Sequence, residues 1–242
     1  MKEKIEIYDS GEKLAESVAK IIQQKTIEKQ KRNEQLFIAL SGGNTPKILF
    51  ELLANQYKKT INWNSIRFYW VDERCVPPND DESNFGVVKS LLFNNIEIYG
   101  SRIERMQGEN EPHEEAFRYM EILSSQLPSK NSVPSFDLIL LGMGDDGHTA
   151  SIFPNQPHLL NSDKLCEVSE HPISGQKRIT LTTKTINNAA EIIFLVTGEK
   201  KAQIIKEILK QEDNYLEYPS AHIQPTWGEL TWMLDKEAAQ FL

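Results

Sequence analysis

The chain has 242 residues, of which 39% are hydrophobic and 26% are charged, a composition typical of a folded globular protein. Its 27 basic and 35 acidic side chains give a formal net charge of -8 at pH 7, which disfavours nucleic acid as a partner because no dense basic stripe is available to face a phosphate backbone. The charged amino terminus lacks a signal-peptide core and no apolar run is long enough to span a bilayer, so we expect a cytoplasmic protein without a membrane partner.

Apolar segments with strand-like and helix-like periods alternate along the chain. In the first part the pattern predicts strands at 5–8, 36–40 and 66–71, and helices at 14–27, 46–57, 84–93 and 111–127. Further on it predicts strands at 136–141 and 192–196 and a helix at 200–209. Short apolar strands separated by helices favour parallel pairing with helices on both faces, so we expect an α/β fold.

Three stretches in the second half are less regular. Residues 155–177 lack a strong period and predict a long loop or a small excursion, and residues 212–229 are loop-like. Residues 230–242 are expected to add a last strand or helix to the core. Because no repeat or low-complexity linker interrupts the chain, we expect a single domain over residues 1–242.

The strand at 36–40 runs into a glycine turn that could bind an anion. Two glycines allow close approach of a ligand, two hydroxyls add donors, and Pro46 suits the first turn of the following helix, whose free N–H groups attract negative charge. The spacing is neither a Walker loop nor a dinucleotide fingerprint, and a capped helix start explains the same residues equally well. The candidate binding residues of this turn are Ser41, Gly42, Gly43, Asn44 and Thr45.

A second polar cluster follows the strand at 66–71. Asp72, Glu73 and Arg74 could bind a polar ligand and stabilise developing negative charge, or could form a structural ion-pair cluster. Downstream, Ser83 and Asn84 are typical of a helix start that supplies its own caps.

The strand at 138–141 leads into the most informative segment, in which three glycines surround Asp145 and Asp146 and precede His148. The carboxyl end of a strand in an open α/β sheet is where ligands bind. Because histidine titrates near neutral pH and a carboxylate can orient it, His148 with Asp146 has the equipment of a general base. A glycine-rich turn with a solvated histidine is the alternative for this segment taken alone.

The fourth candidate group is cationic. It combines Arg178 with Lys200 or Lys201, and these side chains could give charge-assisted hydrogen bonds to a phosphate. Solvated surface cations are the alternative, and it is stronger for Lys200 than for Lys201. Four polar strand ends on one sheet edge would together form a pocket for a small phosphorylated sugar. No metal is required by the spacing of the histidines or of Cys75 and Cys166.

Taken in chain order, these motifs resemble the 6-phosphogluconolactonase family. The resemblance implies a Rossmann-like, parallel-rich sheet with helices on both faces, similar to the fold of glucosamine-6-phosphate deaminases and ribose-5-phosphate isomerases. It also implies hydrolysis of 6-phospho-D-glucono-1,5-lactone to 6-phosphogluconate in the oxidative pentose phosphate pathway, with no cofactor and no required metal. Asn155 departs from the pattern, because a glycine commonly follows the Phe-Pro pair. The resemblance rests on Ser41 to Pro46, Asp72 to Arg74, Ser83 and Asn84, Leu141 to Pro154, Arg178 to Thr182 and Gly198 to Ala202.

Within this resemblance we expect His148 to accept a proton from the water that attacks the lactone carbonyl, while Asp146 fixes its tautomer and orientation. Arg74 would stabilise the oxyanion or steer the ring, and Asp72 would hold Arg74 or a substrate hydroxyl. The turn from Ser41 to Thr45, Arg178 and Lys201 would bind the phosphate.

Two other functions compete with this one. A glucosamine-6-phosphate deaminase has the same scaffold, but its pattern places Ile-Ala-Phe-Asn-Glu-Pro where this chain has Thr149 to Pro154, and Tyr in place of Arg74. A non-catalytic sugar-phosphate sensor would keep the pocket, yet would be expected to lose His148 and Asp146. The oligomeric state is left open, and a monomer is compatible with the sequence.

Overall fold

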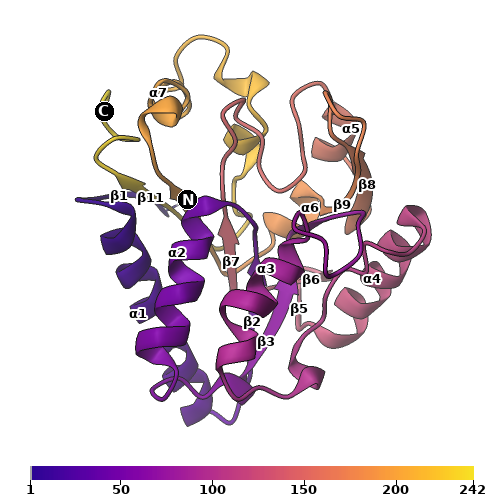
Figure 1. Ribbon diagram of the computed structural model, residues 1–242. Coiled ribbons are helices and arrows are strands. Elements are labelled where there is room, and N and C mark those ends of the chain that lie inside the picture. The colour runs from indigo at the N-terminus through magenta and orange to yellow at the C-terminus, as the bar shows by residue number, and fades with distance from the viewer. Residues whose placement is uncertain (1) are drawn as a thin grey trace.

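The computed structural model describes residues 2–242 and is built on a six-stranded sheet in the order β1-β11-β10-β7-β2-β3 (Figure 1). Every neighbouring pair in this sheet is parallel. Each predicted strand is present, and the irregular carboxyl-terminal segment supplies a strand rather than a helix. The six strands are β1 (Lys2–Tyr8), β2 (Leu36–Leu40), β3 (Ile66–Trp70), β7 (Leu138–Leu141), β10 (Glu191–Val196) and β11 (Glu229–Asp235).

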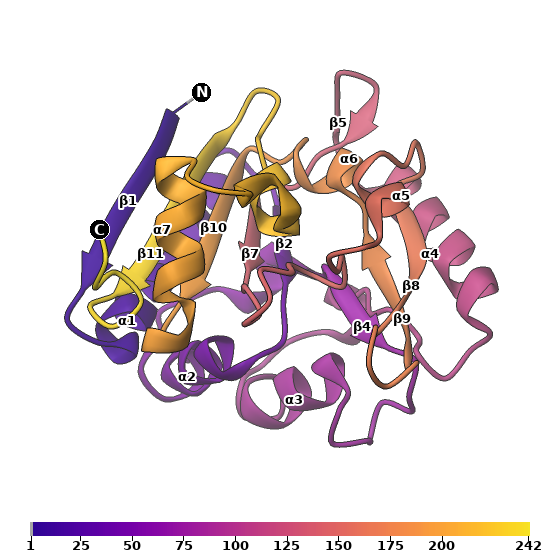
Figure 2. The same ribbon diagram turned by 90° about the horizontal axis from the view of Figure 1, so that it is seen from above.

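Helices cover both faces of the sheet, as the alternation of apolar segments predicts. Helices α1 and α2 lie on one face and α7 lies on the other (Figures 1 and 2). Helix α1 buries Leu14, Val18 and Ile22, which recur every four residues and so form one apolar stripe. The helices are α1 (Gly11–Lys31), α2 (Asn44–Leu52), α3 (Asn84–Leu91), α4 (Pro112–Gln126), α5 (Pro157–Leu160), α6 (Thr183–Ile186) and α7 (Ala202–Lys210).

A second, antiparallel sheet lies beside the large one and packs against α4 (Figure 2). It consists of β4 (Asp72–Arg74), β9 (Lys177–Leu181) and β8 (Cys166–Glu170) in that spatial order. A separate hairpin pairs β5 (Ser129–Lys130) with β6 (Val133–Pro134). Of the two alternatives expected for residues 155–177, a long loop or a small excursion, the structure shows an excursion that contains α5 and β8. The sequence did not predict β8 because its five residues mix polar and apolar side chains without clear alternation.

Several element boundaries differ from the sequence prediction. The helix expected over 46–57 begins two residues earlier as α2 and continues as a single wide turn over Leu53–Tyr57. The helix expected from residue 200 begins at Ala202, after a tight 3-10 turn over Glu199–Lys201. None of the described helices is long and apolar enough to cross a membrane. One domain over residues 1–242 stays a prediction.

The order of the strands reverses direction between β2 and β7. After β2 the chain adds β3 on one side of it, and β7, β10 and β11 then follow in turn on the other side. At such a reversal the neighbouring connections leave in opposite directions, so a crevice opens at the carboxyl ends of the two central strands. The Ser41 hydroxyl, which donates to the Leu140 carbonyl oxygen at 2.5 Å, joins the two strands at this point.

Glu73 links the small sheet to the start of α3. Its carboxylate is 2% exposed and accepts hydrogen bonds from the backbone N–H groups of Arg74, Asn84 and Phe85 at 2.7 to 2.8 Å, and from the Ser83 hydroxyl at 3.1 Å. Burial raises the pKa of this carboxyl, and the three N–H donors oppose the rise. Of the two alternatives given for this cluster, ligand binding or a structural role, the contacts of Glu73 therefore favour the structural role.

Replacement of Glu73 by alanine should strongly destabilise the fold, because three backbone N–H groups and a hydroxyl lose their acceptor together. We expect the free energy of unfolding, measured with urea, to fall by about 2–4 kcal/mol. The control Glu51→Ala removes an exposed carboxylate from α2 and should change it by less than about 0.5 kcal/mol. Equal effects of the two substitutions would contradict the role given to Glu73.

Candidate active site

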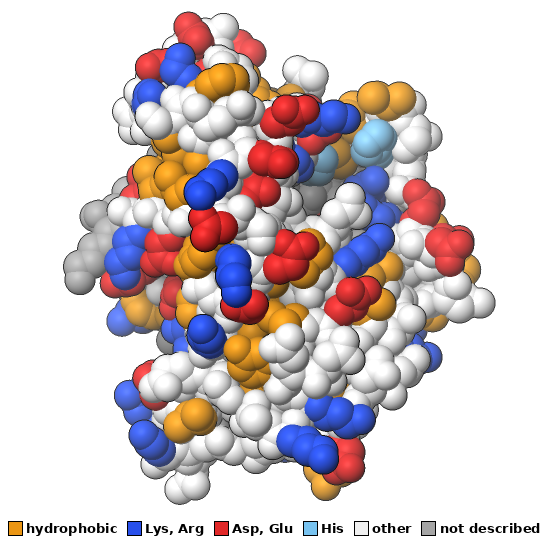
Figure 3. Space-filling model, turned by 60° about the vertical axis from the view of Figure 1, so that its left-hand side comes forward, with side chains coloured by type: hydrophobic (Ala, Val, Ile, Leu, Met, Phe, Trp, Pro, Cys, Tyr) orange, Lys and Arg blue, Asp and Glu red, His pale blue; other side chains and the backbone are white. Residues whose placement is uncertain are grey.

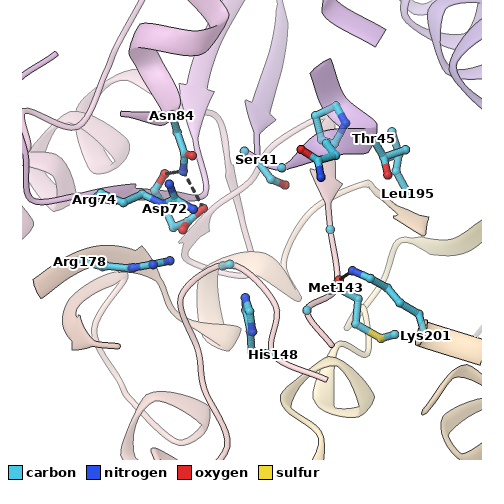
Figure 4. Close-up of a pocket in the computed structure, with 17 residues that line it drawn as sticks. Ser41, Thr45, Asp72, Arg74, Asn84, Met143, His148, Arg178, Leu195 and Lys201 are labelled. Atoms are coloured by element: carbon cyan, nitrogen blue, oxygen red, sulfur yellow. Dashed lines mark hydrogen bonds between the residues drawn. The ribbon is translucent and has the colours of Figure 1, made fainter. Parts of the chain in front are cut away.

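The crevice between β2 and β7 holds a cavity of about 270 Å³, into which four adjacent strands send the residues that follow them (Figure 4). The two glycine turns predicted from the sequence lie on the same rim, since a Cβ on Gly142 would stand 3.9 Å from the carbonyl oxygen of Gly42. Of the predicted site residues, all but Asp146 line this cavity. The lining consists of Ser41, Gly42, Gly43, Asn44, Thr45, Pro46, Asp72, Arg74, Asn84, Gly142, Met143, Gly144, His148, Ala150, Arg178, Leu195 and Lys201.

The glycine turn after β2 brings bare backbone to the cavity wall. Gly43 has a φ of 110°, a conformation that side chains other than glycine rarely adopt. Gly42 packs so closely under Asn84 that a Cβ would stand 1.9 Å from the Asn84 amide oxygen. Helix α2 begins directly after these glycines, so its first N–H groups, which have no partner within the helix, lie at the cavity.

The two hydroxyls of this turn already have partners within the protein. Ser41 donates to the Leu140 carbonyl, and the Thr45 hydroxyl lies 2.7 Å from that of Thr197. The donors that the turn can offer to an anion are therefore mainly the N–H groups at the start of α2, joined by the Thr45 O–H when Thr197 is the donor in their pair.

His148 is held on three sides. Its Nδ1 lies 2.5 Å from Asp146 Oδ1, and its backbone N–H donates to the same oxygen at 3.1 Å. A Cβ on Gly144 would stand 2.2 Å from the imidazole, so only glycine leaves room for the ring there. The ring of Phe153 packs on the imidazole with 4.7 Å between centroids. With Nδ1 donating to the carboxylate, Nε2 keeps its lone pair and can accept a proton.

Asp146 lies behind His148 and outside the cavity lining. Burial acts to raise the pKa of its carboxyl, but the hydrogen bond and the charge of His148 outweigh this, so that the pKa lies below its ordinary value. Asp146 therefore stays ionised at neutral pH and can orient the imidazole.

Asp72 is fixed by a buried network. Its side chain is 4% exposed, accepts a hydrogen bond from the Ser151 hydroxyl at 2.7 Å and another from the Asn84 amide at 3.4 Å. The Arg74 guanidinium instead donates to the Glu82 carbonyl oxygen at 2.7 Å. Within residues 2–242, no ion pair joins Asp72 to Arg74, so the first of the two expected roles of Asp72 is absent, and a hydrogen bond to a substrate hydroxyl stays a prediction.

Arg178 reaches the cavity from the small sheet, not from a strand end of the large one as the sequence suggested. It stands opposite Arg74 in the register of β4 and β9. Burial first, and then the charge of Arg74, lower the pKa of Arg178. The Nε atoms of both arginines are buried and have no partner among the described residues. Two adjacent cations with unused donors favour an anion between or beside them.

Lys201 faces the cavity from the other side. Its ammonium group donates to the Met143 carbonyl oxygen and lies 3.4 Å from Asp145 Oδ1. Lys200 is exposed and does not line the cavity, which agrees with the weaker case made for it from the sequence. In Figure 4, Arg178 and Lys201 extend into the cavity from opposite sides, with Ser41 on the upper wall and His148 below.

Some lining residues were not identified from the sequence. Asn84 was predicted as part of a helix start and as one of the residues that carry the family resemblance, but without a role in binding. Ser83 does cap α3, through a hydrogen bond from the Gly86 N–H at 3.0 Å, whereas the Asn84 side chain lines the cavity. Met143 and Leu195 supply apolar surface that carries no sequence signal of its own. Asn155, the departure from the family pattern, has a φ of 68°, a region that glycine favours and asparagine tolerates.

The surface of the molecule is mixed in charge. Figure 3 shows one face, on which acidic and basic side chains are intermingled and histidine side chains lie near the upper right. Among residues 2–242, no group of three or more His, Cys, Asp or Glu side chains is arranged to hold a metal ion.

Known proteins with similar sequences and structures point to one family. The family described as glucosamine-6-phosphate isomerases/6-phosphogluconolactonase matches residues 9–232. The 6-phosphogluconolactonase of Haemophilus influenzae is 48% identical over 227 residues, which cover 93% of this chain and 95% of that protein. The 6-phosphogluconolactonase from Trypanosoma brucei, whose three-dimensional structure is known, is 27% identical, with a TM-score of 0.88 and coverage of 100% of this chain and 99% of the other.

A monomeric glucosamine-6-phosphate deaminase shares the fold, with a TM-score of 0.80 at 20% identity over 99% of this chain and 100% of the other. This likeness confirms the expected relation of the scaffold to the deaminases and says nothing about activity. From the extent of the family match and the identity to its relatives, the chain belongs to the glucosamine-6-phosphate isomerase/6-phosphogluconolactonase family.

Proposed function

We propose that this protein hydrolyses 6-phospho-D-glucono-1,5-lactone to 6-phosphogluconate, the lactonase step of the oxidative pentose phosphate pathway. The observation that carries the proposal is the single cavity in which an imidazole oriented by a carboxylate faces cationic side chains on two other walls. One group would activate water while the cations hold the phosphate. The cytoplasmic location expected from the sequence belongs to the same proposal.

In the reaction, a water molecule attacks the lactone carbonyl carbon as His148 Nε2 accepts one of its protons. The tetrahedral intermediate then collapses, the bond from the carbonyl carbon to the ring oxygen breaks, and His148 returns the proton to that oxygen, which becomes a hydroxyl. One water is consumed, and the new carboxylic acid releases a proton to solvent. Arg74 would stabilise the negative charge on the carbonyl oxygen in the intermediate.

The phosphate would be bound where three anion-attracting groups converge. The N–H groups at the start of α2 line one wall, and Arg178 and Lys201 approach from opposite sides. Binding energy from this distant group would place the carbonyl carbon beside the water and His148, which is how a remote substrate group accelerates a reaction. Asp72, buried and fixed by Ser151 and Asn84, would accept a hydrogen bond from a sugar hydroxyl.

Deamination of glucosamine 6-phosphate on the same scaffold is the second candidate. The segment from Thr149 to Pro154 lacks the acidic residue of the deaminase pattern, and the position of Arg74 carries no tyrosine. Release of ammonia from glucosamine 6-phosphate at a rate above that of lactone hydrolysis would reverse this assignment. Tight binding of 6-phosphogluconate without turnover of fresh lactone would instead support a sensor.

Replacement of His148 by alanine should remove the base and leave the fold intact, because the side chain borders a cavity. We expect the enzymatic rate to fall by about 10²–10⁴-fold. The assay should generate the lactone in situ and subtract its spontaneous hydrolysis in buffer. His158→Ala, an exposed substitution in α5, is the matched control and should retain full activity. A folded His148→Ala protein with near-normal turnover would refute the proposed base.

Lys201 and Lys200 form a natural pair for testing the phosphate site. Lys201→Ala removes a cation that faces the cavity, and a charge-assisted hydrogen bond of about 1.5–3 kcal/mol corresponds to an increase of KM by about tenfold to a hundredfold. Lys200→Ala removes the same charge from the adjacent exposed position and should leave KM unchanged. If both variants raise KM equally, the effect comes from long-range electrostatics, and the proposed contact between Lys201 and the phosphate is refuted.

A further inference from the structure

Phe153 is a fully buried aromatic side chain that does not belong to the main hydrophobic core. It is 1% exposed, yet it lies outside the main cluster of buried apolar side chains. A large apolar ring is normally buried against other apolar groups.

Its recorded ring contacts are side chains at or beside the cavity. The imidazole of His148 lies 4.7 Å from the ring, centroid to centroid, at an angle of 46°. The guanidinium carbon of Arg178 lies 5.5 Å from the ring centroid. His171 packs edge-on at 5.2 Å and 85°. One ring thus contacts both the proposed base and a proposed phosphate ligand, which come from different sheets.

The backbone that carries Phe153 is firmly held. Ala150, with a φ of 50°, belongs to a tight turn closed by the Ile152 N–H donating to the Thr149 carbonyl at 2.9 Å. Inside this turn Ser151 is fully buried and bonds to three elements: its hydroxyl donates to Asp72, its N–H to the Thr180 hydroxyl at 3.2 Å, and its carbonyl accepts from the Ser169 hydroxyl at 2.5 Å. The ring is therefore a fixed surface.

The ring of Phe153 contributes more to the position of Arg178 than to that of His148. His148 is also held by Asp146 and by the close approach of Gly144. The guanidinium of Arg178, by contrast, makes no hydrogen bond or ion pair to any other residue within 2–242, and its Nε is buried without a partner. Stacking on an aromatic face fixes the plane of a guanidinium while its N–H groups stay available to an anion.

We propose that Phe153 is a positioning residue that sets the base and the phosphate-binding arginine at a fixed separation, an inference that rests on the proposed lactonase function. Phe153 is not among the residues that line the cavity. It acts by holding His148 against Asp146 and by orienting Arg178 toward the phosphate. The separation of His148 and Arg178 then matches the distance between the carbonyl carbon and the phosphate of the substrate. Misplacement of such groups by about 1 Å can cost about a hundredfold in rate.

Phe153→Leu tests this inference, because it keeps an apolar side chain but removes the aromatic face. We expect KM to rise and kcat to fall, with kcat/KM lower by about ten- to a hundredfold. The matched control is Phe136→Leu, which removes an equally buried ring whose aromatic partner is the core residue Tyr69. Both variants should lose stability, but only Phe153→Leu should change the kinetic constants. Kinetic constants of Phe153→Leu equal to those of Phe136→Leu would overturn the proposal.

A double-mutant cycle separates the two contacts of the ring. In an Arg178→Ala background, Phe153→Leu should raise KM no further, since the guanidinium it orients is gone, while kcat should still fall through His148. Independent, multiplicative effects on KM would show that Phe153 does not act through Arg178 and would contradict the inference.

A second measurement does not depend on whether Phe153→Leu folds or on turnover. Incorporation of 4-fluoro- and 3,4,5-trifluorophenylalanine at position 153 weakens the negative face of the ring with little change in shape. The dissociation constant for inorganic phosphate should rise with each step of fluorination, and the ring-current shift of the His148 imidazole protons should persist. Phosphate affinity that does not change with fluorination would overturn the role of the ring toward Arg178. A wild-type protein with no lactonase activity would refute the proposed function but leave this binding result readable.

Discussion

The reversal of strand order between β2 and β7 is the constraint on which the site depends. Parallel strands place all their carboxyl ends at one edge, and the reversal separates the two connections that leave the central pair. Because β2 is followed by glycines and β7 by a glycine-rich turn, bare backbone lines both sides of the opening. The Ser41 hydroxyl bonded to the Leu140 carbonyl fixes the gap between them. The strand order thus places the polar side chains around one opening, and the glycines after β2 and β7 keep that opening free of side chains.

The small antiparallel sheet supplies what a parallel sheet edge alone cannot. Strand β4 follows β3 by one residue, and its pairing with β9 brings Arg178 opposite Arg74, more than a hundred residues apart in the chain. Glu73 and Ser151 then secure this sheet to α3 and to the loop that carries His148. Neither residue faces the cavity. Buried hydrogen-bonding groups around the site therefore hold the positions of the groups that meet the ligand, a division of labour typical of preorganised sites.

The sequence predicts the parts of this structure that depend on local pattern. The apolar runs of β2 and β10, the glycine turns and the segment around His148 are each written in consecutive residues, so their place at a common edge follows from parallel pairing. Strand β8 was missed because Cys166 to Glu170 mixes buried and polar positions without alternation. The placement of Arg178 depends on the register between two strands, and the contact of Phe153 with His148 depends on tertiary packing. Neither leaves a signal in neighbouring residues.

The unliganded site holds unfavourable charge. Arg74 and Arg178 lie side by side, and their buried Nε atoms have no partner in the part of the chain that the structure describes; burial and the charge of Arg74 lower the pKa of Arg178. The β4–β9 ladder and the ring of Phe153 maintain this arrangement against the repulsion between the two cations. Under the proposed function, an anion entering the cavity would supply acceptors for these donors and a charge of opposite sign. If the proposed phosphate site is correct, these local cations would attract a phosphate although the net charge of -8 opposes its approach.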